Sequence, residues 1–270
     1  MTDRIAAMFA RTRAEARPAL IPFVPGGWPE IDATIEIARA AVEGGADALE
    51  LGIPFSDPLA DGVTNQQAYQ QALALGVTLA TVLDAVRAIR ASGITIPLLL
   101  MGYSNTLFSY DLPRFVRDAT EAGVDGLVIV DLPPEEAGEL EALARAVGMH
   151  LIYLLAPTST HNRIAAVAAH ASGFIYCVSV TGVTGARTAL SDDLPAFLGR
   201  VREQTSVPLA VGFGISQPEH VQAIGAVADA AIVGGAFVQV VGAASRDGRA
   251  EAVRAFVAAM RGLETTRAGG

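Results

Sequence analysis

The chain has 270 residues, of which 51% are hydrophobic and 17% are charged, and its formal net charge is −9. This composition excludes an intrinsically disordered chain, and the acidic balance argues against binding to nucleic acid or to anionic membranes through a basic surface. The sequence contains no lysine, which excludes a mechanism that forms a lysine Schiff base.

The residues typical of disulfides, metal sites and targeting segments are scarce. Cys177 is the only cysteine, and the four histidines show no spacing typical of metal ligands, so we expect no disulfide, metal or other cofactor. The charged, amphipathic start at residues 1–17 lacks the apolar stretch of a signal peptide, and no run of about 18 apolar residues follows. We therefore expect a cytoplasmic protein without membrane spans.

Short apolar runs alternate with segments of helical periodicity along the chain. An amphipathic helix is predicted at about residues 2–15, where it caps the bottom of the fold. Eight buried strands are predicted at Ala19–Val24, Ala48–Gly52, Ile96–Met101, Gly126–Asp131, Met149–Leu155, Phe174–Ser179, Leu209–Phe213 and Ala228–Val233. Helices are predicted between them, among others at Ile31–Glu43, Leu79–Ser92, Leu112–Ala122, Pro134–Val147 and Leu194–Gln204.

This alternation predicts an α/β fold, a closed (β/α)8 TIM barrel of the usual size of about 250 residues. A doubly wound sheet is the alternative, and it is less favoured because no GxGxxG turn follows the first strand. No linker rich in proline or glycine divides the chain, so we expect a single domain over residues 1–270, with a frayed tail at 265–270.

A carboxylate interrupts the second predicted strand, where Glu50 lies between Leu49 and Leu51. Burying a carboxylate is costly, so a structural glutamate with a buried partner and an acid–base group with a raised pKa both fit. Asp61 follows in a loop with two prolines and no flexible filler. Since reacting groups of such barrels lie at the carboxyl ends of strands, the barrel favours the acid–base interpretation.

Three glycine-bearing turns follow the last predicted strands, at residues 182–185, 212–216 and 234–235. Each turn alone is ordinary, but together they lie where such barrels often bind phosphate, near a short extra helix after the eighth strand. The long loop over residues 181–192 has the features of a lid. Four aromatic residues at strand ends are either ordinary core or a flat slot for an aromatic ligand: Phe23, Tyr103, Tyr176 and Phe213.

The string ELGIPFSDPLADG, residues 50–62, resembles the signature of the tryptophan synthase alpha subunit family. Further segments resemble that family in the same order over nearly the whole chain: Gly102–Asn105, Ala122–Gly126, Asp131–Glu135, Ala156–Ser159, Gly182–Gly185 and Gly212–Ser216. The resemblance implies a TIM barrel that splits indole-3-glycerol phosphate into indole and glyceraldehyde 3-phosphate. It also implies a partner, the tryptophan synthase beta subunit, in an α2β2 complex.

The resemblance also implies roles for individual residues. Glu50 and Asp61 match the catalytic pair, with Glu50 moving protons and Asp61 stabilising charge at the indole nitrogen. Substrate-binding positions match Phe23, Met101, Tyr103, Leu127, Tyr176, Thr184 and Phe213. Phosphate-binding positions match Gly185, Gly214, Gly234 and Gly235, the last of which is usually serine in the family. Positions at the beta-subunit interface match Pro54, Asp57, Pro58, Asn105 and Phe108.

Several loop residues depart from the family pattern, among them Val63, where proline is common, and Asn65, where an aliphatic residue is common. These departures leave two alternatives open beside an alpha subunit in its complex. One is a stand-alone lyase with the same chemistry, and the other is a non-catalytic barrel that activates its partner. Another phosphosugar enzyme on the same barrel would explain the glycines but not residues 50–62.

Overall fold

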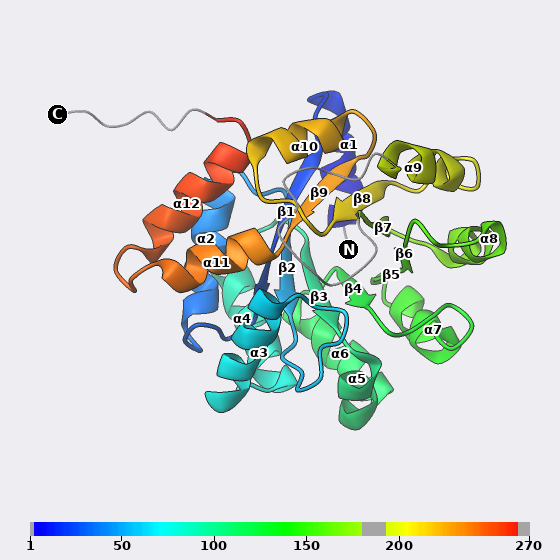
Figure 1. Cartoon of the computed structure of the whole chain (residues 1–270). Helices are drawn as coiled ribbons and strands as arrows, with labels where there is room; N and C mark the ends of the chain where they lie inside the picture. Colours follow the sequence, from blue (N-terminus) through cyan, green and yellow to red (C-terminus); the bar gives the residue numbers. More distant parts are fainter. Residues whose placement is uncertain (1–2, 180–192, 264–270) are drawn as a thin grey trace.

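The computed structural model describes residues 3–179 and 193–263, and these residues form a barrel of parallel strands surrounded by helices (Figure 1). The strands are β1 (Ala19–Pro25), β2 (Leu49–Gly52), β3 (Leu98–Gly102), β4 (Gly126–Ile129), β5 (His150–Ile152), β6 (Leu154–Leu155), β7 (Ile175–Val178), β8 (Leu209–Gly212) and β9 (Ala230–Val233). Their order in the sheet is β5-β4-β3-β2-β1-β9-β8-β7-β6.

The two edges of this sheet belong to one continuous segment, because only Tyr153 separates β5 from β6. β5 pairs with β4, β6 pairs with β7, and the backbone N–H of Tyr176 donates a hydrogen bond of 3.0 Å to the carbonyl of Tyr153. The barrel is therefore closed, which confirms the predicted fold and rejects the doubly wound alternative. The predicted fifth strand is divided in two at this bend.

Helices follow or precede most strands. They are α1 (Arg4–Ala14), α2 (Ala33–Glu43), α3 (Val63–Ala74), α4 (Leu79–Ala91), α5 (Ser104–Tyr110), α6 (Leu112–Ala122), α7 (Gly138–Ala146), α8 (His161–His170), α9 (Leu194–Arg202), α10 (Pro218–Gly225), α11 (Gly235–Ala243) and α12 (Arg249–Met260). The helix predicted from Pro134 begins four residues later, at Gly138. The short helix expected after the eighth barrel strand is α11.

The pairing register shows which side chains point into the barrel. Phe23 pairs with Glu50, Glu50 with Leu99, and Leu99 with Gly126, so these residues share one face of the sheet. A Cβ at Gly126 would lie 3.3 Å from Ile5 of α1, the helix that plugs the barrel bottom. That face is therefore the interior, and the Glu50 carboxyl group points into the barrel.

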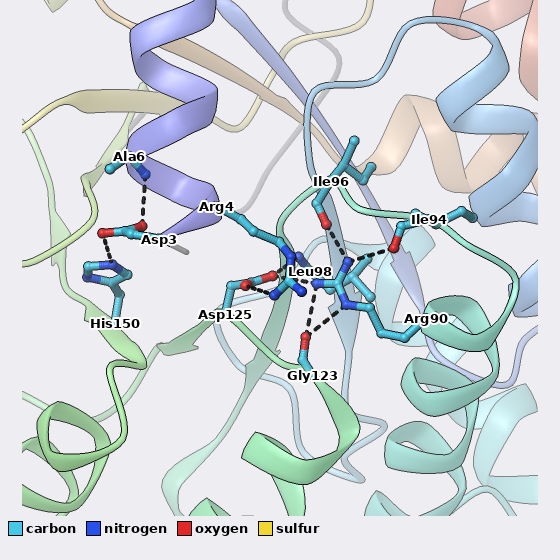
Figure 2. Close-up of polar contacts among 10 residues, drawn as sticks. All are labelled: Asp3, Arg4, Ala6, Arg90, Ile94, Ile96, Leu98, Gly123, Asp125 and His150. Atoms are coloured by element: carbon cyan, nitrogen blue, oxygen red, sulfur yellow. Dashed lines mark hydrogen bonds and ion pairs between the residues drawn. The ribbon is translucent and has the colours of Figure 1, made fainter. Parts of the chain in front are cut away.

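Helix α1 closes the amino-terminal end of the barrel, as predicted, and polar contacts fix it there (Figure 2). The Asp3 side chain accepts a hydrogen bond of 2.9 Å from the backbone N–H of Ala6 and lies 3.0 Å from Nε2 of His150. Arg4 Nη1 donates to Oδ1 of Asp125 at 2.9 Å. An N-cap and two interactions with strand entries thus hold the helix beneath the strands.

Asp125 joins several segments at this end of the barrel (Figure 2). Its Oδ2 accepts hydrogen bonds from Arg90 at 2.5 Å and from the backbone N–H of Leu98 at 2.8 Å. Arg90 also donates to three backbone carbonyls, those of Ile94, Ile96 and Gly123. The pair is mostly buried, with 13% of the Arg90 side chain and 9% of the Asp125 side chain exposed.

Replacing Asp125 with alanine is expected to lower the free energy of unfolding by about 3 kcal/mol, because the buried charge of Arg90 loses its only carboxylate partner among the described residues. Urea unfolding measures this loss. The matched control is Asp84→Ala, which breaks an ion pair whose aspartate is 72% exposed and is expected to cost under about 1 kcal/mol. Equal losses in the two variants would contradict a structural role for the Asp125 contacts.

Two observations apply to the described part of the chain alone. No single helix within residues 3–179 and 193–263 is long and apolar enough to cross a membrane, although α3 and α4, bent by 97°, pass the length and composition criteria together. Within the same residues, no three His, Cys, Asp or Glu side chains are grouped so that they could hold a metal ion.

Candidate active site

Two buried carboxyl groups lie at the carboxyl end of the barrel, and each residue is only 1% exposed. Glu50 belongs to β2 and points into the barrel. Asp61 belongs to the loop between β2 and α3, two residues before the helix begins. The charge of Asp61 acts on Glu50, so the two residues predicted as a catalytic pair lie close enough to interact.

Three hydrogen bonds donated by side chains fix the position of Asp61. The Tyr103 hydroxyl group donates to Oδ2 at 2.8 Å, and Asn65 Nδ2 donates to Oδ1 at 3.2 Å. The backbone carbonyl of Asp61 accepts a hydrogen bond of 2.8 Å from Gln66 Nε2. Burial raises the pKa of the Asp61 carboxyl group, and the hydrogen bonds from Tyr103 and Asn65 act in the opposite direction by stabilising the carboxylate.

Glu50 is held very differently, since neither carboxyl oxygen has a hydrogen-bond partner among the described residues. Burial, and secondly the negative charge of Asp61, raise the pKa of Glu50 to about 8. At neutral pH Glu50 is therefore mostly protonated. The structure thus combines an unpaired acid whose pKa is raised to about 8 with a second acid whose position is fixed by hydrogen bonds.

Aromatic rings surround the two acids. Phe23 packs edge-on against Tyr69 with ring centres 6.3 Å apart, and Tyr176 packs edge-on against Phe213 at 6.1 Å. The Tyr103 ring stacks on a further ring, that of Phe55, at 4.9 Å. Burial raises the pKa values of Tyr69 and Tyr176 well above 10, and the charges of Asp61 and Glu50 add to this effect.

Two glycines make room for these rings. A Cβ at Gly52 would lie 2.5 Å from the Tyr69 hydroxyl oxygen, and a Cβ at Gly212 would collide with the Tyr176 hydroxyl group. Any side chain at either position would displace a tyrosine from the barrel interior. Four of the predicted substrate-binding residues thus come together here with the acids: Phe23, Tyr103, Tyr176 and Phe213.

Leu127 does not join this group, which corrects the sequence-based assignment. It pairs with Leu100, and side chains alternate across a strand, so Leu127 faces the surrounding helices and not the interior. Its neighbour Val128 pairs with Met101, and both of these buried side chains face the interior. Met101 therefore stays a candidate for the apolar wall, and Val128 replaces Leu127.

The predicted phosphate-binding residues lie at two neighbouring strand ends. Gly214 adopts a φ of +73°, and the preceding Phe213 a φ of +72°, after β8. Gly234 precedes α11, and Gly235 begins it. The N-cap residue of this nine-residue helix is Gly234, which has no side chain to cap it, so among the described residues its first N–H groups can face an anion.

Two sequence-based assignments, Thr184 and Gly185, lie outside the described residues, as does the proposed lid over residues 181–192. A Cβ at Gly235 would meet nothing within 4 Å. Nothing in the described neighbourhood therefore requires glycine at the position where the family usually has serine.

The predicted partner-contact residues divide into two groups. Asp57, Asn105 and Phe108 are exposed near the carboxyl end of the barrel, and Phe108 is 52% exposed. Pro54 and Pro58 are buried within the chain, so they can shape the loop but offer a partner little surface. Two apolar residues beside them are exposed, Leu59 at 84% and Val63 at 64%, and the sequence reasoning assigned neither of them to the partner surface.

Sequence reasoning also assigned no place in the site to two polar residues, Tyr69 and Asn65, the second of which it noted only as a departure from the family pattern. Both belong to α3 and lie four residues apart, so they share a face of that helix, and the Tyr69 hydroxyl group has no partner among the described residues. The available signal was this spacing directly after Asp61. We did not expect a helix there, because its apolar periodicity is weak.

Comparisons with known proteins identify the family of the chain. The family model described as "Tryptophan synthase alpha chain" matches residues 9–267. The chain is 52% identical over 239 residues to the tryptophan synthase alpha chain of Roseiflexus castenholzii, covering 88% of this chain and 92% of the relative. It is 48% identical over 267 residues to that of a Polaromonas species, covering 96% and 98%.

Solved structures give the same result. Tryptophan synthase subunit alpha from Legionella pneumophila superposes with a TM-score of 0.89 at 34% identity, covering 97% of this chain and 98% of the other. A chain of Mycobacterium tuberculosis tryptophan synthase superposes with a TM-score of 0.88 at 35% identity and the same coverage. The chain therefore belongs to the tryptophan synthase alpha chain family.

Proposed function

We propose that Glu50 and Asp61 carry out the reaction of this family, the cleavage of indole-3-glycerol phosphate into indole and D-glyceraldehyde 3-phosphate. One observation supports the proposal above all others. Two buried carboxyl groups lie close together, one without a hydrogen-bond partner among the described residues and with a raised pKa, the other fixed by Tyr103 and Asn65. This is the arrangement that an acid–base cleavage of a carbon–carbon bond requires.

The proposed chemistry begins at the indole ring. Glu50 donates its proton to indole C3, which leaves positive charge on the ring, centred on the nitrogen. The Asp61 carboxylate accepts a hydrogen bond from the ring N–H and stabilises that charge. The bond from C3 to the side chain then breaks, its electrons return to the ring, and the adjacent hydroxyl group gives its proton to the Glu50 carboxylate as the aldehyde forms.

This sequence of steps restores both carboxyl groups, and the products contain all the atoms of the substrate. It uses neither an imine nor a metal ion, in agreement with a chain that lacks lysine. In this proposal the apolar surroundings of the indole ring are formed by Phe23, Met101, Tyr103, Tyr176 and Phe213. The low polarity of such surroundings strengthens the interaction between Asp61 and the developing charge.

For the phosphate group we propose the backbone N–H groups at Gly214, Gly234 and Gly235, together with the amino terminus of α11. With a net charge of −9, the chain is suited to hold phosphate by backbone dipoles more than by a basic patch. Thr184 and Gly185 complete the proposed site from the segment outside the described residues.

The chain works with the tryptophan synthase beta chain as its partner. We propose that Asp57, Asn105 and Phe108 contact the beta chain and that Pro54 and Pro58 shape the loop between them. We also propose that residues 1–270 form one domain and that the protein is cytoplasmic.

The test of this function is the release of indole from indole-3-glycerol phosphate by the purified chain, alone and with a beta chain. Slow release that accelerates with the partner would support an alpha chain that depends on its complex. Fast release without any effect of the partner would favour the stand-alone lyase. The absence of release in both cases would overturn the catalytic proposal and leave a non-catalytic partner of the beta chain.

The protonation of Glu50 predicts how the rate depends on pH. The raised pKa means that Glu50 keeps its proton below pH of about 8 and loses it above. Since this proton goes to the substrate first, kcat/KM of the free chain should be highest below pH of about 8 and fall as the pH rises further. Initial rates between pH of about 6 and about 10 measure this, and a kcat/KM that increases across this range would show that the ionised form acts first.

A further inference from the structure

Asn65 occupies a position in the active site that the proposed mechanism does not yet use. It lies in the first turn of α3, one turn before Tyr69. Its Nδ2 donates to Oδ1 of Asp61 at 3.2 Å, while its own Oδ1 is buried and has no hydrogen-bond partner among the described residues. A buried acceptor without a donor is costly, and such atoms in a site often await a ligand.

The orientation of this amide follows from its neighbour. The NH2 group of Asn65 faces Asp61, because Nδ2 donates to Oδ1 of that carboxyl group. Its carbonyl oxygen is thereby turned away from Asp61 and needs a donor from elsewhere. The fixed Asp61 thus determines which kind of group can meet the free end of Asn65, namely a hydroxyl or an N–H.

The surroundings of Asn65 place its amide group beside both proposed contacts of the substrate. A Cβ at Gly234 would be 3.8 Å from Asn65 Nδ2 and also 3.8 Å from the Phe23 ring. Gln239 of α11 donates a hydrogen bond of 3.4 Å to Thr64, so the first turn of α3 lies against α11 (Figure 1). Asn65 therefore sits between Asp61, the proposed partner of the indole N–H, and Gly234, the proposed partner of the phosphate.

The part of the substrate between the ring and the phosphate is the glycerol chain. It carries two hydroxyl groups, one on the carbon whose bond to the ring breaks and one on the next carbon, toward the phosphate. We propose that Asn65 is a specificity-determining residue whose Oδ1 accepts a hydrogen bond from this second hydroxyl group while its Nδ2 holds Asp61. The inference rests on the proposed roles of Asp61 and of Gly234.

In this arrangement efficient turnover requires the second hydroxyl group of the substrate, which is more than an additional contact. A substrate without it would leave the buried Oδ1 of Asn65 unpaired in the complex, and a site built around a hydrogen bond discriminates strongly against an analogue that lacks the group. The same amide holds the catalytic carboxylate, so loss of the hydroxyl would also loosen Asp61. The discrimination is therefore expected in kcat as well as in KM.

The experiment compares indole-3-glycerol phosphate with its analogue that has hydrogen in place of the second hydroxyl group and can still be cleaved. For the unmodified chain, kcat/KM should be about 10-fold to 100-fold lower with the deoxy analogue. In Asn65→Leu, the ratio of kcat/KM with indole-3-glycerol phosphate to kcat/KM with the deoxy analogue should fall to about 1, because both substrates then meet an apolar side chain. The exposed Gln67 of the same helix gives the control, Gln67→Leu, which should keep the ratio of the unmodified chain.

If the leucine variant does not fold, Asn65→Ser replaces it, because a serine side chain is too short to reach both Asp61 and the second hydroxyl group of the substrate. A merely structural role for Asn65 would lower kcat/KM for both substrates equally and leave the ratio unchanged, which overturns the inference. An unmodified chain that does not distinguish the two substrates overturns it as well. If Glu50→Gln keeps its turnover, the proposed role of Glu50 fails, whatever the ratio shows, and if the unmodified chain releases no indole, the proposed function itself fails.

Discussion

Replacing Glu50 with glutamine is expected to reduce the turnover of indole-3-glycerol phosphate by about 1,000-fold or more. Glutamine has nearly the same shape, but it has no proton of suitable acidity to give to indole C3 and cannot take one from the hydroxyl group. Because neither carboxyl oxygen has a protein partner among the described residues, the exchange breaks no hydrogen bond there. The fold and the binding of a phosphate-bearing indole should both persist.

Indole release in a single-turnover experiment measures this rate, and calorimetry with an unreactive analogue measures binding. Glu139→Gln provides the control, since Glu139 is exposed on α7, away from the pair, and the variant should match the unmodified chain. Turnover of Glu50→Gln within about tenfold of the unmodified rate would mean that another group supplies the proton, because general acid–base catalysis contributes more than that.

Replacing Asp61 with asparagine is expected to raise the barrier by about 3 kcal/mol, on the order of a 100-fold loss in rate. The positive charge at the indole nitrogen develops only as C3 is protonated, so the carboxylate acts mainly on the transition state. Affinity for the substrate should change by less than about tenfold, since a neutral amide oxygen still accepts a hydrogen bond from the ring N–H.

The comparison of kcat with the dissociation constant of an unreactive analogue separates the two effects. Asp247→Asn, at an exposed position near α12, should leave both values unchanged. A variant of Asp61 that binds the analogue at least 100-fold more weakly but turns over bound substrate normally would contradict the account. Asp61 would then be a group that binds the ground state and not one that stabilises charge in the transition state.

The fold could be predicted from the sequence because each strand is a short apolar run and each connection is long enough for a helix. The division of the fifth strand at Tyr153 could not be predicted. It arises because this segment pairs with β4 at one end and with β7 at the other, and those partners are fixed only when the barrel closes.

The sequence also could not show which of two neighbouring residues in a strand faces the barrel interior. The choice of Leu127 over Val128 shifted the assignment by one residue, and a shift of one residue moves a side chain to the opposite face. Both residues are buried and apolar, so nothing in their chemistry distinguishes the interior of the barrel from the layer between strands and helices. Only the strand pairing distinguishes the two residues, because it places Val128 opposite Met101.

Within the site, Glu50 could be predicted because a carboxylate is conspicuous in an apolar strand. Asn65 and Tyr69 could not, because an amide and a phenol are ordinary on a helix and become significant only when that helix lies over Asp61. Their unpaired buried atoms are properties of the folded chain. The sequence therefore predicts the reacting groups better than the residues that position them.

A crystal structure of Glu50→Gln with bound indole-3-glycerol phosphate tests the central claim most directly, because the substrate should survive in this variant. We predict the indole N–H within hydrogen-bond distance of Asp61, at about 3 Å, with the introduced amide side chain beside indole C3 and the phosphate against the N–H groups at Gly234 and Gly235. A ring nitrogen turned away from Asp61, or a phosphate bound elsewhere, would contradict the account.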